Sequence, residues 1–133
     1  MSQQINLARV EMSMNRKDIG KLGEKLAQKF LKKRGYHIYE TNFYCQTGEI
    51  DIVARRRDYL VFIEVRTKSN LDFGTPEESI TANKKKRLIS SSLHYINTHH
   101  GLPTSWRIDV VAIEIDDKGK TKRIELIENA ITL

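Results

Sequence analysis

Two strand-like runs between residues 48 and 68 constrain the fold more than any other part of the chain. In the first run, 48–55, polar and apolar side chains alternate. One face is predicted to carry Glu49, Asp51, Val53 and Arg55, and the other Ile50, Ile52 and Ala54. The second run, 59–68, is apolar on both faces as far as Ile63, which is typical of a buried central strand. The short polar segment 56–58 between the runs predicts a β-hairpin.

The register of this hairpin brings two carboxylates together. A turn centred between Arg57 and Asp58 places Asp51 directly opposite Glu64. Opposed side chains have Cβ atoms roughly 4.5–5.5 Å apart, and two like charges there destabilise a sheet unless something neutralises them. A bound divalent cation is one way to do so. The alternative is that Asp51 lies at a frayed strand end and that Glu64 pairs with Arg66 or Arg55.

The rest of the chain alternates between helical and strand patterns. Helices are predicted over 17–34, closed by Gly35, and over 81–98, with Thr81 as the N-terminal cap. Strands are predicted over 36–44, 106–115 and 122–127, the last as a short edge strand. Together the patterns predict one α/β domain over 17–133, in which helices flank a mixed sheet, preceded by an arm over 1–16 that is either disordered or a short helix.

Glu24 lies at the margin of the apolar face of the first helix. Gly23, near the middle of that face, would let another element approach closely. Glu24 is then placed to lean over whatever the helix packs against. The plainer alternative is a helix-surface contact with Gln28, Lys21 or Lys25.

The second helix begins with four cations, Lys84, Lys85, Lys86 and Arg87. Positive charge is unfavourable at the positive end of a helix dipole, unless an anion is bound there. A backbone phosphate would meet both the charges and the free amides of the first turn. A solvated run of charges is the alternative.

Composition points to an anionic partner rather than to a membrane. Lys plus Arg is 23 and Asp plus Glu is 17, which gives a net charge of +6 and favours nucleic acid or another anionic surface. No apolar run approaches the ~18 residues of a membrane-spanning helix. The first residues show no signal-peptide pattern, so a cytoplasmic location is expected. Cys45 is the single cysteine, which excludes an internal disulfide and a cysteine-built zinc site.

Three motifs in combination resemble the bacterial YraN family: Glu24 in GEKLAQKFL, GEID at 48–51 and EVR at 64–66. That family is regarded as part of the PD-(D/E)xK nuclease superfamily, with similarity to archaeal Holliday junction resolvases. The resemblance covers about residues 17 to 127. It implies a restriction-endonuclease-like core, a three-layer α/β fold with a central mixed sheet flanked by helices and catalytic carboxylates on a hairpin.

The resemblance also implies a site. Asp51 and Glu64 correspond to the carboxylates that hold a divalent metal, Mg²⁺ or Mn²⁺, and Glu24 to a first-helix glutamate that contributes to it. Arg66 and Lys68 complete the expected catalytic set. The residues expected to contact nucleic acid are Arg55, Arg56, Arg57, Lys84, Lys85, Lys86 and Arg87.

The chain departs from the superfamily pattern at Arg66, where a lysine is expected. An arginine can stabilise charge on a phosphate but cannot readily accept a proton from water, because its pKa exceeds ~12. Lys68 shares the face of Arg66, but lies nearly 7 Å further along the strand. The family also often carries a basic residue between Asn42 and Gly48, where this chain has none, so one phosphate contact is expected to be missing.

Three functional hypotheses follow. The first is a metal-dependent DNA endonuclease, possibly on branched DNA, for which the resolvase similarity favours a homodimer. The second is a nucleic-acid-binding module that keeps the nuclease fold without its activity. The third is an interaction domain whose positive charge serves only solubility.

Overall fold

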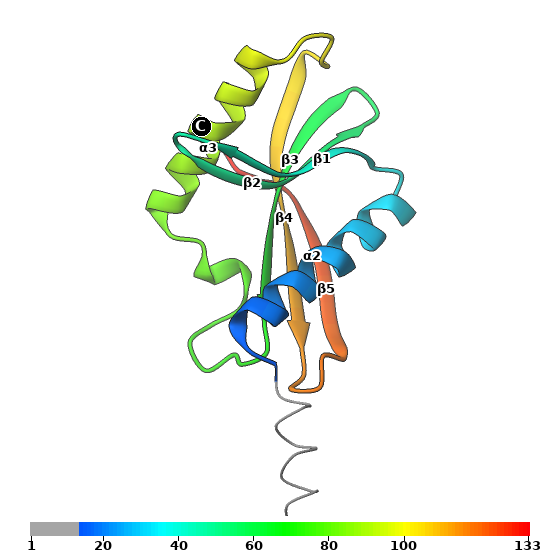
Figure 1. Cartoon of the computed structure of the whole chain (residues 1–133), viewed down its shortest axis with the longest axis vertical. Helices are drawn as coiled ribbons and strands as arrows, with labels where there is room; N and C mark the ends of the chain where they lie inside the picture. The colour runs from blue at the N-terminus through cyan, green and yellow to red at the C-terminus, as the bar shows by residue number, and fades with distance from the viewer. Residues whose placement is uncertain (1–13) are drawn as a thin grey trace, which may run out of the picture.

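The protein is built on one five-stranded sheet with a helix on each face (Figure 1). The structure, a computed structural model, describes residues 14–133. Most of the predicted N-terminal arm, 1–16, lies outside the described residues. The elements are α2 (Arg16–Lys33), β1 (His37–Cys45), β2 (Gly48–Arg56), β3 (Tyr59–Lys68), η1 (Glu77–Ser79), α3 (Ala82–Thr98), β4 (Ser105–Ile115) and β5 (Thr121–Ile131).

The sheet is mixed, and β3 is its central strand. The strand order is β1-β2-β3-β4-β5. The β3–β4 pair is parallel, with α3 in the connection between them, and the other three pairs are antiparallel. Leu60, Val61, Phe62 and Ile63 are all fully buried, which confirms β3 as a strand covered on both faces.

Two separate cores hold the layers together. On one face α2 packs through Ala27 and Leu31 against Ile52, Ile63 and Val111. On the other face α3 packs through Leu88 and Tyr95 against Val53, Phe62 and Ile108. The predicted fold class is confirmed: this helix–sheet–helix arrangement is consistent with a restriction-endonuclease-like fold.

The predicted ends of both helices are close to the observed ones because their caps form as expected. Gly35 adopts φ +87° just after α2, where the left-handed conformation favours glycine. Thr81 caps α3, and its hydroxyl accepts a hydrogen bond from the Lys84 backbone N–H at 3.1 Å. Both helices are amphipathic, and within residues 14–133 none has the length and hydrophobicity to span a bilayer.

The last strand is longer than predicted. It continues past Ile127 to Ile131, which pairs with Ile108. The ladder is interrupted between the pairs Val110↔Ile127 and Ile108↔Ile131. There Asn129 adopts a positive φ of 50°, and its backbone N–H donates a hydrogen bond to Asp109 Oδ1 at 2.9 Å. This irregularity lets polar residues occur inside the strand, which breaks the alternation of polar and apolar residues. For that reason the sequence pattern predicted an end at Ile127.

Candidate metal and nucleic-acid site

The register predicted for the β2–β3 hairpin is confirmed, but its ladder ends one pair short of the carboxylates. The pairs run from Arg56↔Tyr59 to Ile52↔Ile63. Beyond the last pair, the Asp51 side chain replaces a backbone carbonyl as the acceptor: its Oδ2 accepts a hydrogen bond from the Val65 N–H at 2.8 Å. Asp51 is therefore held beside the β3 backbone at the point where the two strands separate.

This separation changes the face on which one residue lies. Ile52 and Ala54 pack under α2 and Val53 under α3, as strict alternation requires. Ile50 was predicted on the face of Ile52, and that prediction is wrong, because Ile50 joins the core under α3. Pairing with β3 ends between the two residues, so the alternation enforced by the ladder also ends there.

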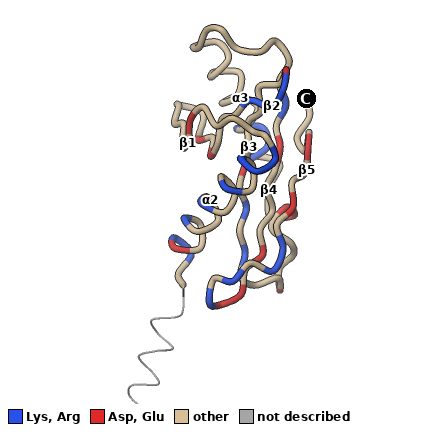
Figure 2. Tube along the Cα trace, turned by 90° about the vertical axis from the view of Figure 1, so that its right-hand side faces the viewer, with Lys and Arg blue, Asp and Glu red and all other residues tan. Residues whose placement is uncertain are grey.

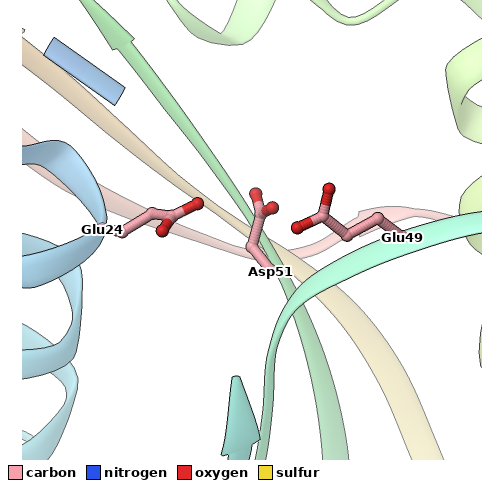
Figure 3. Close-up of side chains that lie close together, drawn as sticks. All are labelled: Glu24, Glu49 and Asp51. Carbon is pink, nitrogen blue, oxygen red and sulfur yellow. The ribbon is translucent and has the colours of Figure 1, made fainter. Parts of the chain in front are cut away.

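Three carboxylates converge above β2. Glu24 reaches in from α2, Glu49 and Asp51 come from β2, and one oxygen of each lies within 4.8 Å of the others (Figure 3). All three side chains are half-buried. Sequence reasoning proposed Glu24 and Asp51 as ligands but missed Glu49. The signal for it was the predicted alternation itself, which placed Glu49 and Asp51 on one face.

Glu64 lies beside this cluster and is more deeply buried. Its side chain is only 3% exposed. Its Oε2 is shared by Arg66, through Nε at 3.0 Å and NH2 at 2.9 Å, and by the Lys84 ammonium at 3.7 Å. Its Oε1 is buried and has no hydrogen-bond partner among the described residues. A buried, unpaired carboxylate oxygen is costly, and it marks a place for a cation or a donor.

The cluster lacks the positive charge needed to offset its own repulsion. Burial, and then repulsion by the negative charge of Glu64, raise the pKa of Asp51 to about 7. Burial raises the pKa of Glu24, and the neighbouring Asp51 and Glu49 raise it further. The pKa of Glu49 is raised by burial and by Asp51, although the Tyr44 hydroxyl and Lys84 oppose the shift. Lys84 also acts to lower the pKa of Asp51, so it faces both carboxylates.

The cations of the predicted set occupy three different places. Arg66 is held on Glu64, as in the ion-pair alternative. Lys68 lines the same cleft, but its ammonium donates to the Gly74 carbonyl at 3.4 Å rather than to a carboxylate. Lys84, predicted as a phosphate contact, instead is the one lysine within residues 14–133 that forms an ion pair with a site carboxylate.

The remaining predicted nucleic-acid contacts stay outside the cluster. Lys85, Lys86 and Arg87 are exposed on the first turns of α3. Arg55 and Arg56 end β2 and Arg57 begins the turn after it, roughly 13–20 Å along the chain from Asp51 at ~3.3 Å per residue. Seen from the side, basic and acidic residues are interspersed along α2 and the sheet (Figure 2). Any contact with an anionic polymer therefore depends on local groups of cations.

A cleft of about 640 Å³ opens onto the carboxylates. It lies between α2, β3 and the segment that follows β3. Its lining includes Arg16, Glu24, Asp51, Glu64, Arg66 and Phe73. The cleft combines acidic groups with cations and one aromatic side chain, and it is large enough for a nucleotide-sized group.

The donor set fits a hard divalent cation. Carboxylate oxygens are the ligands that Mg²⁺ and Mn²⁺ prefer. The unpaired Glu64 Oε1 and the raised pKa values of Glu24, Glu49 and Asp51 are the two signs that the site is built for positive charge. Arg66 and Lys84 compete with such a cation, because both already form ion pairs with Glu64 Oε2.

Comparisons with known proteins identify relatives over most of the chain. Residues 23–113 match the model of the uncharacterised protein family UPF0102, the family that the three sequence motifs resemble. A UPF0102 protein from Dehalococcoides mccartyi is 47% identical over 90% of this chain and 98% of its own length. Others are from Moorella thermoacetica, 41% identical over 90% and 99%, and from Caldicellulosiruptor saccharolyticus, 38% identical over 88% and 99%.

Proposed function

The chain belongs to the uncharacterised protein family UPF0102, and from the geometry of its acidic site we propose that it is a divalent-metal-dependent nuclease acting on DNA. The observation that carries the proposal is the convergence of Glu24, Glu49 and Asp51 beside the buried Glu64 in an open cleft.

The proposed ligands are Glu24, Glu49, Asp51 and Glu64. A bound Mg²⁺ or Mn²⁺ would lower the pKa of a coordinated water and stabilise negative charge on the phosphate. The protein's own contribution is positioning. The Val65 N–H orients Asp51, and the close contact of α2 with β3 brings Glu24 to the cluster.

Arg66 and Lys84 have different proposed roles. Arg66 holds Glu64 in one orientation and offers its remaining N–H groups to a phosphate oxygen, but its high pKa prevents it from accepting a proton. Lys84 would supply the positive charge that the superfamily pattern expects from a lysine at position 66. Its backbone is held by the Thr81 cap and its side chain reaches Glu64. We therefore assign to Lys84 the positive charge beside the scissile phosphate.

Calorimetric titration and cleavage assays test this proposal together. Mg²⁺ and Mn²⁺ are titrated into the wild type, Asp51→Asn and the matched control Asp117→Asn, which changes an exposed turn residue. Labelled duplex, single-stranded and four-way-junction DNA are then incubated with each protein. We expect the wild type and Asp117→Asn to bind metal and cut at least one substrate, and Asp51→Asn to lose both properties. A wild type that binds no metal, or cleavage retained by Asp51→Asn, would overturn the proposal.

A second function is favoured by the ion pair between Arg66 and Glu64, in which Arg66 Nε donates a hydrogen bond to Glu64 Oε2. If this ion pair persists in solution, the protein is a nucleic-acid-binding module with a nuclease fold and no turnover. The same experiments separate the two functions, because the module would bind DNA in a salt-dependent way, with no cleavage of any substrate in Mg²⁺ or Mn²⁺.

A further inference from the structure

Two aromatic side chains near the carboxylate site are largely exposed to solvent. Phe73 is 93% exposed and Tyr44 is 71% exposed. Among the large apolar side chains that the structure describes as exposed, only Leu133, near the chain end, is comparably accessible. Because exposing an aromatic ring forfeits much of its burial free energy, one such ring in the cleft and another paired with a site carboxylate indicate a binding surface.

Phe73 belongs to the cleft itself. It lines the same cavity as Glu24, Asp51 and Glu64. Its loop is held in place at several points: the Gly74 N–H donates to the Leu71 carbonyl at 3.1 Å, and Lys68 contacts the Gly74 carbonyl. Further along, Glu77 is tied to Arg123 on β5 at 2.6 Å. The ring is therefore presented to solvent by a tethered loop.

Tyr44 flanks the cluster from the other strand hairpin. It is paired with Glu49 across β1 and β2, and its hydroxyl interacts with the Glu49 carboxylate. In Figure 1 the turn between β1 and β2 overlaps α3, whereas the loop after β3 lies lower on the same side of the picture. The carboxylates thus have one exposed ring contributed by each of two separate segments.

We propose that Phe73 and Tyr44 stack on unpaired bases of the strand whose phosphate lies at the carboxylates, so that the substrate class is DNA with single-stranded nucleotides. This inference rests on the proposed function. The faces of bases are accessible in single strands, tails and branch points, but not within a closed duplex. Base–aromatic stacking strengthens binding by about 5- to 100-fold per base, and every base has a face to offer.

The surroundings favour a nucleic acid over a protein partner. The fully buried centre of a protein–protein interface is depleted of charged residues. Here Phe73 shares its cleft with three carboxylates and with Arg16 and Arg66. That mixture suits a metal-bound phosphate next to an apolar base face.

Fluorescence anisotropy tests the inference, with Ca²⁺ in place of Mg²⁺ as the oxygen-binding cation. The probes are a labelled oligothymidine, a blunt duplex, and the same duplex with a single-stranded tail. We expect Phe73→Ala and Tyr44→Ala each to weaken binding of the oligothymidine and the tailed duplex by about 5- to 100-fold, and to change blunt-duplex affinity less than about twofold. The control Leu71→Ala removes another exposed side chain of the same loop, and it should have no such selective effect.

Ring-retaining variants decide whether stacking is responsible. Phe73→Trp and Tyr44→Phe should keep the affinity, and the new indole of Phe73→Trp should be quenched by oligothymidine. Equal losses on all three probes, no loss at all, or full rescue by Phe73→Leu would overturn the inference, and the last result would indicate an apolar contact of the kind made by a protein partner. If the wild type binds DNA and Phe73→Ala binds every probe with the same affinity as the wild type, only this inference fails. If the wild type binds no probe, the proposed function fails with it.

Discussion

At the residue scale, Asp51 serves the fold and the site at once. Its Oδ2 replaces a missing backbone partner for Val65, which stabilises β3. Its charge, however, faces Glu64 in a largely buried position, which destabilises the folded state. Such opposition between stability and function is common at catalytic centres.

We predict that Asp51→Asn stabilises the metal-free protein at pH 8. The folded-state pKa of Asp51 is about 7, above its ordinary value of 3.8, so ionisation disfavours the folded state. The penalty is absent below pH ~4, grows as the pH rises toward 7 and is then constant. The amide keeps an acceptor for the Val65 N–H, so we expect a gain on the order of 1–3 kcal/mol at pH 8 and almost none at pH 4. Urea unfolding in EDTA at both pH values measures it, and a loss of stability at pH 8 would contradict the prediction.

Lys84 and Lys85 are neighbours of equal charge, and they should have different kinetic effects. Lys84 is half-buried beside Glu64, whereas Lys85 is exposed. If the proposed nuclease function holds, Lys84→Met should lower kcat by about 10²-fold, because a preorganised charge is lost from the proposed reacting centre. Lys85→Met should raise KM with little change in kcat, since it removes only a peripheral phosphate contact. Steady-state cleavage kinetics decide, and equal kcat values for the two variants would remove Lys84 from the site.

At the scale of elements, the approach of α2 to β3 positions Glu24. Gly23 is buried against Thr67, and a Cβ added there would lie 1.8 Å from Thr67 Oγ1 and 2.8 Å from its Cβ. Only a glycine allows the helix to come this close, as the sequence pattern predicted. The next residue is Glu24, so the packing contact and the candidate ligand are coupled directly.

We predict that Gly23→Ala forces α2 away from β3, with a loss of about 1–3 kcal/mol in the free energy of unfolding. It should also weaken metal binding, because Glu24 moves with the helix. Gly20→Ala is the matched control, since a Cβ there meets nothing within 4 Å. It should instead stabilise the helix by about 0.5–1 kcal/mol. Urea unfolding and metal calorimetry compare the two variants, and equal stability would show that the close contact is not limiting.

At the scale of the whole molecule, the net charge is +6. The basic residues are interspersed with acidic ones and do not form one continuous basic face (Figure 2). Lys85, Lys86 and Arg87 form an exposed group of cations directly after Lys84 on α3. None of them forms an ion pair with a site carboxylate, whereas Lys84 does. If the protein binds DNA as proposed, the exposed cations would contact the phosphates around the acidic site.

We predict that replacing Lys85, Lys86 and Arg87 together by glutamine weakens DNA affinity and flattens its salt dependence. Each lost phosphate contact reduces the slope of log affinity against log salt by about 0.9 for duplex DNA, so we expect a reduction of roughly 1–3. The same triple substitution should not change metal affinity, because none of these side chains forms an ion pair with a site carboxylate. An unchanged slope would place the phosphate contacts elsewhere, for example at Arg55, Arg56 and Arg57.

The sequence by itself determined the elements, the β2–β3 register and two of the converging carboxylates. These depend on local physics: side-chain periodicity, caps such as Thr81, a glycine at Gly35 and a short polar turn. The tertiary structure decided which distant groups meet. Glu49 and Asp51 meet Glu24 because α2 packs against the sheet, and Lys84 reaches Glu64 because α3 packs against the sheet. A period-two or helical pattern contains no information about such contacts, since they depend on where whole layers come to rest.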